Sequence, residues 1–224
     1  MIFWRVVRGI VVAICRVVFR VRVVGRDRVP RGGAYVVAPS HRSILDVPFT
    51  AAITRRRIRF LAKQELFSTR IGAALFLRLG AIPVERGTTD RASLRTCDTV
   101  LAGGDPLAVF PEGTRRRGPE IAELFHGAAY LSLRRGVPIV PVGVGGSEEI
   151  LPSGKVLPRP HRVVVVVGEP IVPDAGASAR RRSDVAALTA ELQTRLQACF
   201  DDARRRAGTA TATDALPREV GEHA

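Results

Sequence analysis

Short runs of β-branched and other apolar residues alternate along this chain with longer segments of helical periodicity, and this alternation limits the folds open to it. Seven runs are predicted to be strands: 21–24, 34–38, 58–62, 81–84, 107–110, 138–144 and 162–167. Helices are predicted near 43–54, 70–79, 90–102, 122–135 and 183–206. Strands separated by helices of this length form an α/β sheet with crossover connections. We therefore expect a mostly parallel or mixed sheet covered by helices.

The first 24 residues are apolar but carry regularly spaced arginines. Their longest uncharged run, 9–15, is far shorter than the roughly 20 residues that a membrane-spanning helix needs. On a helical wheel Arg5, Arg8, Arg16 and Arg20 fall within an arc of about 120°, and apolar side chains fill the remainder. Such a helix is suited to the headgroup region of an anionic bilayer. We expect an amphipathic helix that lies on a membrane surface.

Two other interpretations of this segment stay open. The helix could pack on its own domain, or the segment could be a signal peptide, which also has a basic start and a short apolar stretch. Arg16 and Arg20 interrupt the apolar region and no A-x-A cleavage site follows, which argues against the signal peptide. The expected organisation is this segment at 1–24, one domain at 25–206 and a disordered tail at 207–224.

The charge of the chain indicates which partners it meets. The formal net charge is +14, and Lys63 and Lys155 are the only lysines, so nearly all of the basic residues are arginines. Nucleic acid, anionic lipid and phosphorylated substrates could each balance this charge. Aromatic residues make up only 5% of the chain, and no nucleic-acid-binding motif is visible. We therefore favour an anionic membrane surface and expect no nucleic acid.

Three cysteines, Cys15, Cys97 and Cys199, are widely separated in the sequence. Their odd number and their spacing argue against a disulfide framework and against a metal knuckle. We expect free thiols in a reducing compartment, and no metal site.

The stretch PSHRSILD, residues 39–46, places a histidine at the end of a predicted strand and an aspartate five positions later. Ligands bind at the carboxyl ends of strands in open α/β sheets. If His41 lies in the loop and Asp46 reaches back from the helix, the carboxylate can hold one imidazole nitrogen. The other nitrogen can then take a proton from an alcohol. The alternative is that Ser43 and Asp46 form a capping box, which needs no catalysis.

Two further strand ends carry groups that could bind an anion. Arg86 follows the run GAIPVE, and the run VF at 109–110 leads into Pro-Glu-Gly-Thr-Arg. Gly113 permits a turn conformation closed to other residues, and the guanidinium of Arg115 suits phosphate oxygens. Each motif alone could be a surface feature. Together with His41 and Asp46, they indicate one site that contains a base and binds a phosphorylated substrate.

These motifs resemble the glycerophospholipid acyltransferase family, most closely the 1-acyl-glycerol-3-phosphate (lysophosphatidic acid) acyltransferases. Four blocks of that family occur here in order: His41 with Asp46, Gly80 to Arg86, Phe110 to Arg115 without a change, and Val137 to Val142. The resemblance covers about residues 40–142 and more weakly extends to about 172. It implies a glycerol-3-phosphate acyltransferase-like fold.

The resemblance also implies a role for each matching residue. His41 would be the general base and Asp46 would orient it. Arg86, Glu112, Gly113, Thr114 and Arg115 would hold the phosphorylated acceptor, and the Val137 to Val142 segment would help to shape the acyl-donor side. The donor would be acyl-CoA or an acyl-acyl carrier protein, with no metal or bound organic cofactor. Direct attack on a thioester needs no enzyme nucleophile, and the chain has no G-x-S-x-G motif.

The chain departs from the family pattern at a few positions. Ser40 stands where many members have Asn, which could change how the histidine loop is held. His126 either replaces a phosphate-binding lysine or is an ordinary helix-start residue, and we favour the second. His161 and His223 have no partner signal in the sequence, so we expect them to be solvated.

The leading hypothesis is a peripheral or monotopic enzyme on the cytoplasmic face of the cell membrane. It would transfer a fatty acyl chain from a thioester to lysophosphatidic acid and form phosphatidic acid. One rival is a family member that acylates another lysophospholipid or a glycolipid. A remote rival is a non-catalytic binder of anionic membrane or nucleic acid.

Overall fold

A seven-stranded sheet forms the centre of the molecule. The computed structural model describes residues 2–84, 91–150 and 159–209. The strands are β1 (Arg22–Val24), β2 (Val36–Pro39), β3 (Arg59–Lys63), β4 (Ala81–Val84), β5 (Leu107–Ala108), β6 (Ile139–Gly145) and β7 (Val164–Val167). Their order is β1-β7-β6-β2-β5-β3-β4. Only the β6–β7 pair is antiparallel, so the expected mostly parallel, mixed sheet is confirmed.

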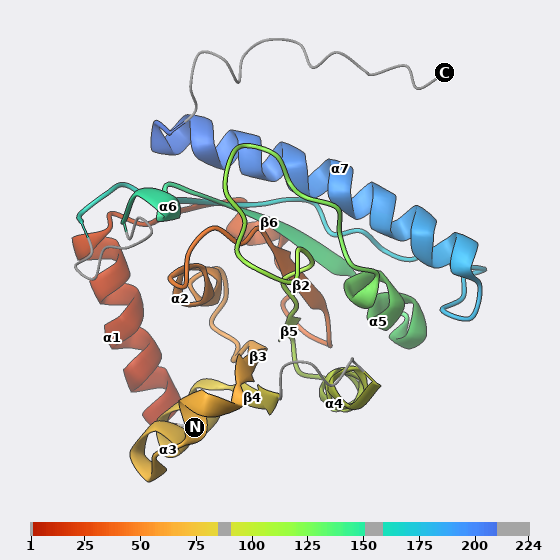
Figure 1. Cartoon of the computed structure of the whole chain (residues 1–224), viewed down its shortest axis with the longest axis horizontal. Helices are drawn as coiled ribbons and strands as arrows, with labels where there is room; N and C mark the ends of the chain where they lie inside the picture. Colours follow the sequence, from red (N-terminus) through yellow and green to blue (C-terminus); the bar gives the residue numbers. More distant parts are fainter. Residues whose placement is uncertain (1, 85–90, 151–158, 210–224) are drawn as a thin grey trace.

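Helices cover both faces of this sheet (Figure 1). They are α1 (Ile2–Val18), α2 (Asp46–Ala51), α3 (Arg70–Leu79), α4 (Arg91–Ala102), α5 (Gly127–Arg135), α6 (Ser147–Ile150) and α7 (Arg182–Ala207). Two short 3-10 helices are η1 (Arg26–Arg28) and η2 (Gln64–Phe67). Side chains of α4, α5 and α7 pack on one face of the sheet, around Leu107 and Ile139. Side chains of α1 and α2 pack on the other face, around Val37 and Val140.

The sequence pattern predicts this element order well. All seven predicted strands and all five predicted helices are present, and the central strands β2, β6 and β7 are buried along their whole length. One boundary differs clearly, because the helix predicted from 122 begins only at Gly127. The preceding residues stay out of the helix because Ala122 N–H donates to the carboxylate of Glu112 and Phe125 N–H to the carbonyl of Pro111.

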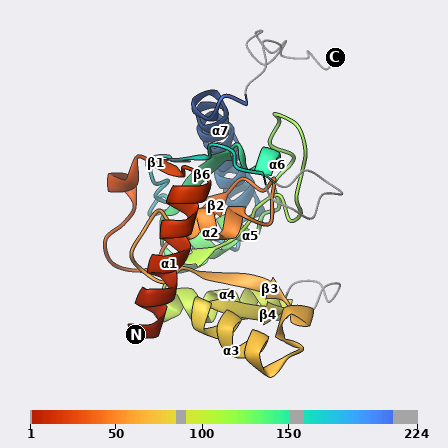
Figure 2. The same ribbon diagram turned by 90° about the vertical axis from the view of Figure 1, so that its left-hand side faces the viewer.

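Helix α1 lies along one side of the domain, and its N-terminal end lies beside α3 (Figure 2). Val12 and Cys15 are buried against the domain. Arg8 also turns inward and donates to the carbonyl of Thr54, so it does not join an outward arginine stripe as the helical wheel suggests. No helix in the described ranges is both long and apolar enough to cross a bilayer. The membrane contact of α1 stays a prediction, and so does the tail, since 210–224 lie outside the described residues.

Candidate active site

The loop that carries His41 leaves the central strand β2 at the carboxyl end of the sheet. Ser40, the residue before His41, is fully buried and joins this loop to β6 in two ways. Its backbone N–H donates to Val142 O at 2.9 Å, and its hydroxyl accepts from Val144 N–H at 2.9 Å. A serine at this position therefore fixes the base of the loop through its short side chain.

His41 and Asp46 form the pair that their spacing predicts. Nδ1 of His41 lies 3.1 Å from Oδ2 of Asp46, and Asp46 is the first residue of α2 while His41 lies in the loop before it. The same Oδ2 accepts from the backbone N–H groups of Arg42 at 2.6 Å and Ser43 at 2.7 Å. The contact to Ser43 is one half of a capping box; the other half is absent, because the Ser43 hydroxyl accepts from Leu45 N–H and the N-cap of α2 is Leu45. Asp46 thus both fixes the start of α2 and holds the imidazole.

The imidazole of His41 is held on a second side by an aromatic ring. Its centroid lies 4.2 Å from that of Phe110, with the two planes tilted by 35°. The His41 side chain keeps 17% of its surface exposed, whereas Asp46 is fully buried. With Nδ1 turned to the carboxylate, Nε2 makes no hydrogen bond to the described part of the chain. That nitrogen can accept a proton from a substrate hydroxyl.

Glu112 is fully buried and binds the histidine loop. Its Oε1 accepts from His41 N–H at 3.0 Å, and Nη1 of Arg42 lies 2.8 and 2.9 Å from its two oxygens. Its Oε2 also accepts from Ala122 N–H at 3.2 Å. The family resemblance implies that Glu112 touches the acceptor, but here its carboxylate is occupied by protein groups. We therefore assign it a positioning role in this structure.

Arg42 completes this buried connection, with a side chain only 1% exposed. Its remaining N–H groups donate to the carbonyls of Gly118 and Glu120. Its guanidinium carbon lies 4.5 Å from the ring centroid of Phe200 in α7. A buried ion pair of this kind is costly to break, because either charge alone would stay desolvated. The histidine loop, the 111–122 loop and α7 therefore hold one another in place.

The turn after β5 presents the predicted anion-binding groups at the surface. Gly113 has φ of +68°, and a Cβ there would lie 2.5 Å from the ring of Phe125. Both facts favour glycine at this position. Thr114 and Arg115 are exposed, and no described residue forms a hydrogen bond or ion pair with the Arg115 guanidinium. Arg116 N–H donates to His41 O at 2.9 Å, so this turn adjoins the histidine.

Some predicted residues do not enter this geometry. Arg86 and His223 lie outside the described residues. His126 is the N-cap residue of α5 and its Nδ1 lies 3.0 Å from the hydroxyl of Thr189, as expected for an ordinary helix-start residue. Nδ1 of His161 lies 2.9 Å from the carbonyl of Arg162. The Val137 to Val142 segment is largely β6 itself, so it forms the strand beside β2.

Comparison with known proteins decides the family. A family model described as Acyltransferase matches residues 20–145, more than half of the chain and including every predicted site residue. The chain belongs to this acyltransferase family.

Named relatives of this acyltransferase include two 1-acyl-sn-glycerol-3-phosphate acyltransferases. The protein from Chlamydomonas reinhardtii is 32% identical over 78% of this chain and 54% of its own length. The protein from Bacillus subtilis is 28% identical over 79% of this chain and 86% of its own length. The chain thus spans about half of the first relative and most of the second.

One solved structure shares the fold of this acyltransferase. It is the crystal structure of the 1-acyl-sn-glycerophosphate (LPA) acyltransferase PlsC from Thermotoga maritima. The TM-score is 0.71, the sequence identity is 24%, and the match covers 88% of this chain and 81% of that one. This likeness supports the fold assigned above.

The thiols of this acyltransferase are all buried, and no disulfide joins any two of them. Burial raises the pKa of Cys199 to about 11 and also raises the pKa of Cys15. The thiolate is the nucleophilic form of cysteine, so a raised pKa makes a thiol unreactive. Among the described residues, no three His, Cys, Asp or Glu side chains are grouped so as to hold a metal ion.

A second acidic group is coupled electrostatically to Asp46. Glu148, in α6, is largely buried, and its Oε2 has no hydrogen-bond partner among the described residues; the same holds for Oδ1 of Asp46. Burial raises the pKa of Glu148, the charge of Asp46 raises it further, and Arg204 opposes the shift. No sequence pattern indicated this electrostatic coupling, because α6 was not predicted.

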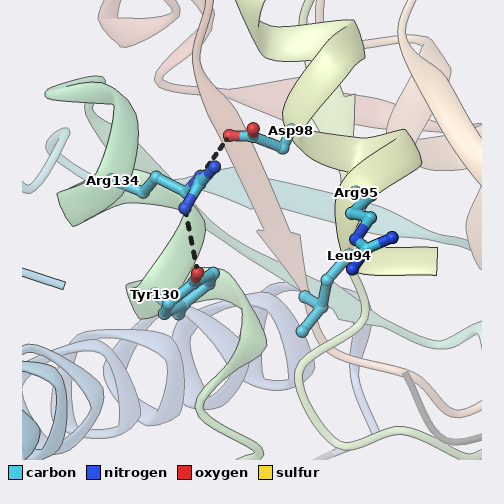
Figure 3. A pocket seen from close by; sticks show the side chains of 5 residues that line it. All are labelled: Leu94, Arg95, Asp98, Tyr130 and Arg134. Atoms are coloured by element: carbon cyan, nitrogen blue, oxygen red, sulfur yellow. Dashed lines mark hydrogen bonds and ion pairs between the residues drawn. The ribbon is translucent and has the colours of Figure 1, made fainter. Parts of the chain in front are cut away.

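A surface hollow between α4 and α5 involves none of the predicted site residues (Figure 3). Its lining residues are Leu94, Arg95, Asp98, Tyr130 and Arg134. Arg134 contacts Asp98 at 3.0 Å and donates to the hydroxyl of Tyr130 at 3.3 Å, and Arg135 also pairs with Asp98. Because these groups largely satisfy one another, we assign the hollow no part in the chemistry.

Proposed function

We propose that this protein transfers a fatty acyl chain from an acyl thioester to the free hydroxyl of lysophosphatidic acid and so forms phosphatidic acid. One observation carries the proposal. Nδ1 of His41 is fixed by the buried carboxylate of Asp46, while the ring remains partly exposed beside the Gly113–Arg115 turn. The membership of the acyltransferase family and the names of the relatives support it.

In the proposed reaction Nε2 of His41 removes the proton from the acceptor hydroxyl. The resulting oxygen nucleophile attacks the thioester carbonyl, a C–O bond forms, and the C–S bond breaks. The departing thiolate takes up the proton from the imidazolium, which restores the free base. Asp46 stabilises the transient positive charge on His41 and keeps its ring in the correct tautomer. The acyl group passes directly between the substrates, so no protein nucleophile is required.

In this proposal, exposed cationic groups bind the phosphate of the acceptor. Arg115 and the hydroxyl of Thr114 face solvent in the turn after β5, and a guanidinium can donate two hydrogen bonds to one phosphate. Arg86, which lies outside the described residues, is the second proposed contact. Glu112 acts through the loop that it holds rather than by touching the phosphate, and Gly113 allows the turn to form.

We propose that the enzyme works on the cytoplasmic face of the cell membrane, with α1 at the bilayer surface. The exposed side chains of this helix include Val6, Ile10 and Ile14, and Arg16 is exposed beside them. A lipid acceptor is held in the membrane, whereas the thioester donor, acyl-CoA or acyl-acyl carrier protein, arrives from solution. An enzyme seated at the interface can reach both.

A panel of acceptors tests this function. Purified full-length protein is incubated with a labelled acyl donor, in both the CoA and the carrier-protein form, and with lysophospholipids that differ in head group. We expect the highest kcat/KM with lysophosphatidic acid. Higher kcat/KM with another lysophospholipid or a glycolipid would favour a different acceptor, and no transfer to any acceptor would reject acyl transfer.

A substitution tests the phosphate contact separately. Arg115→Ala should raise the KM for lysophosphatidic acid about tenfold or more, because one charge-assisted hydrogen bond is worth about 1.5–3 kcal/mol. Arg117→Ala, two residues further on and also exposed, is the matched control. An unchanged KM together with a lowered kcat would contradict a binding role for Arg115.

A further inference from the structure

Large apolar side chains that face solvent are concentrated on two neighbouring segments. Of the twelve exposed in the described part of the chain, nine belong to α1, η2 or α3. They are Val6, Ile10, Ile14, Val17, Val18, Leu66, Ile71, Leu75 and Leu77. Soluble proteins seldom gather exposed apolar residues in this way without a partner.

On α1, the exposed apolar residues form a stripe separate from the face that packs on the domain. Val6, Ile10 and Ile14 recur every four residues, so they share one side of the helix. Val12 and Cys15 are buried on a different side. The stripe therefore remains available after α1 has packed.

On α3, the same arrangement recurs in the middle of the chain. Ile71 is 84% exposed and Leu75 is 40% exposed, four residues further along the same side of the helix. Exposed Arg70 and Arg78 stand at the two ends of α3. Helix α3 also contacts β4, η2 and α1. Figures 1 and 2 both show α3 beside the N-terminal end of α1.

The charges on these two helices select the partner. Neither α1 nor α3 contains an acidic residue, and both contain arginines. Glu65 in η2 is the one acidic residue of the three elements. An anionic bilayer offers negative headgroups to the arginines and an apolar layer to the side chains between them. A second copy of the chain would instead bring like charges together, because a symmetric dimer apposes the same patch on both subunits.

We propose that α3 and η2 form, together with α1, a two-part seat on an anionic lipid bilayer. This deepens the proposed function, since it rests on a lipid acceptor and states which surface meets the lipid. A single amphipathic helix leaves the domain free to rotate about the helix axis. A second contact on α3 fixes that rotation, and with it the direction in which the carboxyl edge of the sheet faces.

Vesicle binding of matched variants tests the proposal without reference to catalysis. Ile71→Asp places a charge in the proposed seat, and Val172→Asp changes an equally apolar residue, 71% exposed, outside it. Co-sedimentation uses full-length protein and phosphatidylcholine vesicles that contain phosphatidylglycerol. We expect Ile71→Asp to weaken binding on the order of tenfold or more and Val172→Asp to leave it unchanged. Added salt should weaken binding of the unchanged protein.

The fluorescence of the single tryptophan tests whether α1 still meets lipid when α3 is changed. Trp4 belongs to α1, so its emission at saturating vesicle concentration reports whether α1 still meets lipid when α3 carries the added charge. In Ile71→Asp the emission shift should persist although more lipid is needed to reach it. Transfer to a short-chain, water-soluble acceptor should be unchanged in both variants, which shows that they fold. If the unchanged protein shows no transfer to this acceptor, the proposed function is rejected, but the proposed membrane contact of α1, η2 and α3 is not.

Two results would overturn the proposal. In one, Ile71→Asp binds vesicles as tightly as Val172→Asp does, so that α3 makes no contact with lipid. In the other, the unchanged protein is a dimer in light scattering, Ile71→Asp makes it a monomer, and vesicle binding is the same for both. That outcome would make the patch an interface between copies.

Discussion

At the scale of single residues, the site depends on where each charge is buried. Asp46 and Glu112 are both fully buried, but their oxygens accept hydrogen bonds from backbone groups and from Arg42. Arg115, by contrast, is exposed, and its guanidinium forms no hydrogen bond or ion pair with a described residue. Buried acids thus position the histidine, while exposed arginines remain available for substrate. This division explains why Glu112 and Arg115, in one short motif, have different roles.

The raised pKa of Glu148 predicts how the free energy of unfolding changes with pH. Burial and the charge of Asp46 raise its pKa above the ordinary 4.5, so the folded chain binds this proton more tightly than the unfolded chain does. The free energy of unfolding should therefore fall as the pH rises from about 4.5 through the raised pKa. Glu148→Gln removes this ionisable carboxyl. The free energy of unfolding of the variant, compared with that of the unchanged protein, should therefore increase as the pH rises over that range.

Urea denaturation at a series of pH values measures this difference. Glu123→Gln, which changes an exposed glutamate that does not act on Glu148, is the control and should show no such trend. A Glu148→Gln variant that loses stability relative to the unchanged protein as the pH rises would contradict the account.

The residue-scale features that the sequence did not predict are contacts between distant positions. His41 and Asp46 could be paired because five residues separate them and a strand precedes them. The stacking of Phe110 on His41 and of Arg42 on Phe200 depends on tertiary packing across many residues. Phe110 belongs to a family block and Arg42 follows His41, but neither pattern predicts which ring each side chain meets. The inward turn of Arg8 was also missed, because a helical wheel does not show where the domain lies.

At the scale of secondary-structure elements, apolar runs and turn residues predict the order of strands and helices. The runs YVVA and VVVVV are buried in β2 and β7 as expected for strands covered on both faces. The four-residue helix α6 is too short to show a period, so it was not predicted. The late start of α5 was missed because the Glu112 hydrogen bond to Ala122 N–H is a tertiary contact.

The connection between β2 and β6 gives a prediction at this scale. Ser40→Ala removes the acceptor of Val144 N–H, which lies in a fully buried strand. An unsatisfied buried N–H costs about 1–3 kcal/mol, so the free energy of unfolding should fall by that amount. Turnover should fall as well, because the loop to His41 loses one of its two attachments.

The matched control is Ser183→Ala, which removes an exposed hydroxyl near the start of α7. Urea denaturation of both variants measures the effect. A Ser40→Ala variant as stable as Ser183→Ala would show that the hydroxyl does not hold the two strands together.

At the scale of the whole molecule, the net charge of +14 includes exposed arginines in the two places that the proposals concern. Exposed arginines flank the apolar side chains of α1 and α3, and Arg115 stands at the carboxyl edge of the sheet. The composition predicted an anionic partner but not where it binds, because location depends on the fold. In this account His41, at the edge of the sheet, is the base, and α1 and α3 make the contact with lipid.

The central claim is that His41 acts as the general base of acyl transfer. The most direct test measures kcat for transfer to lysophosphatidic acid in His41→Ala, with His161→Ala as the control and circular dichroism to confirm folding. We predict that His41→Ala lowers kcat on the order of 10²- to 10⁴-fold while the fold is retained, and that His161→Ala does not lower it. A folded His41→Ala protein with kcat within a few-fold of the unchanged protein would contradict the account.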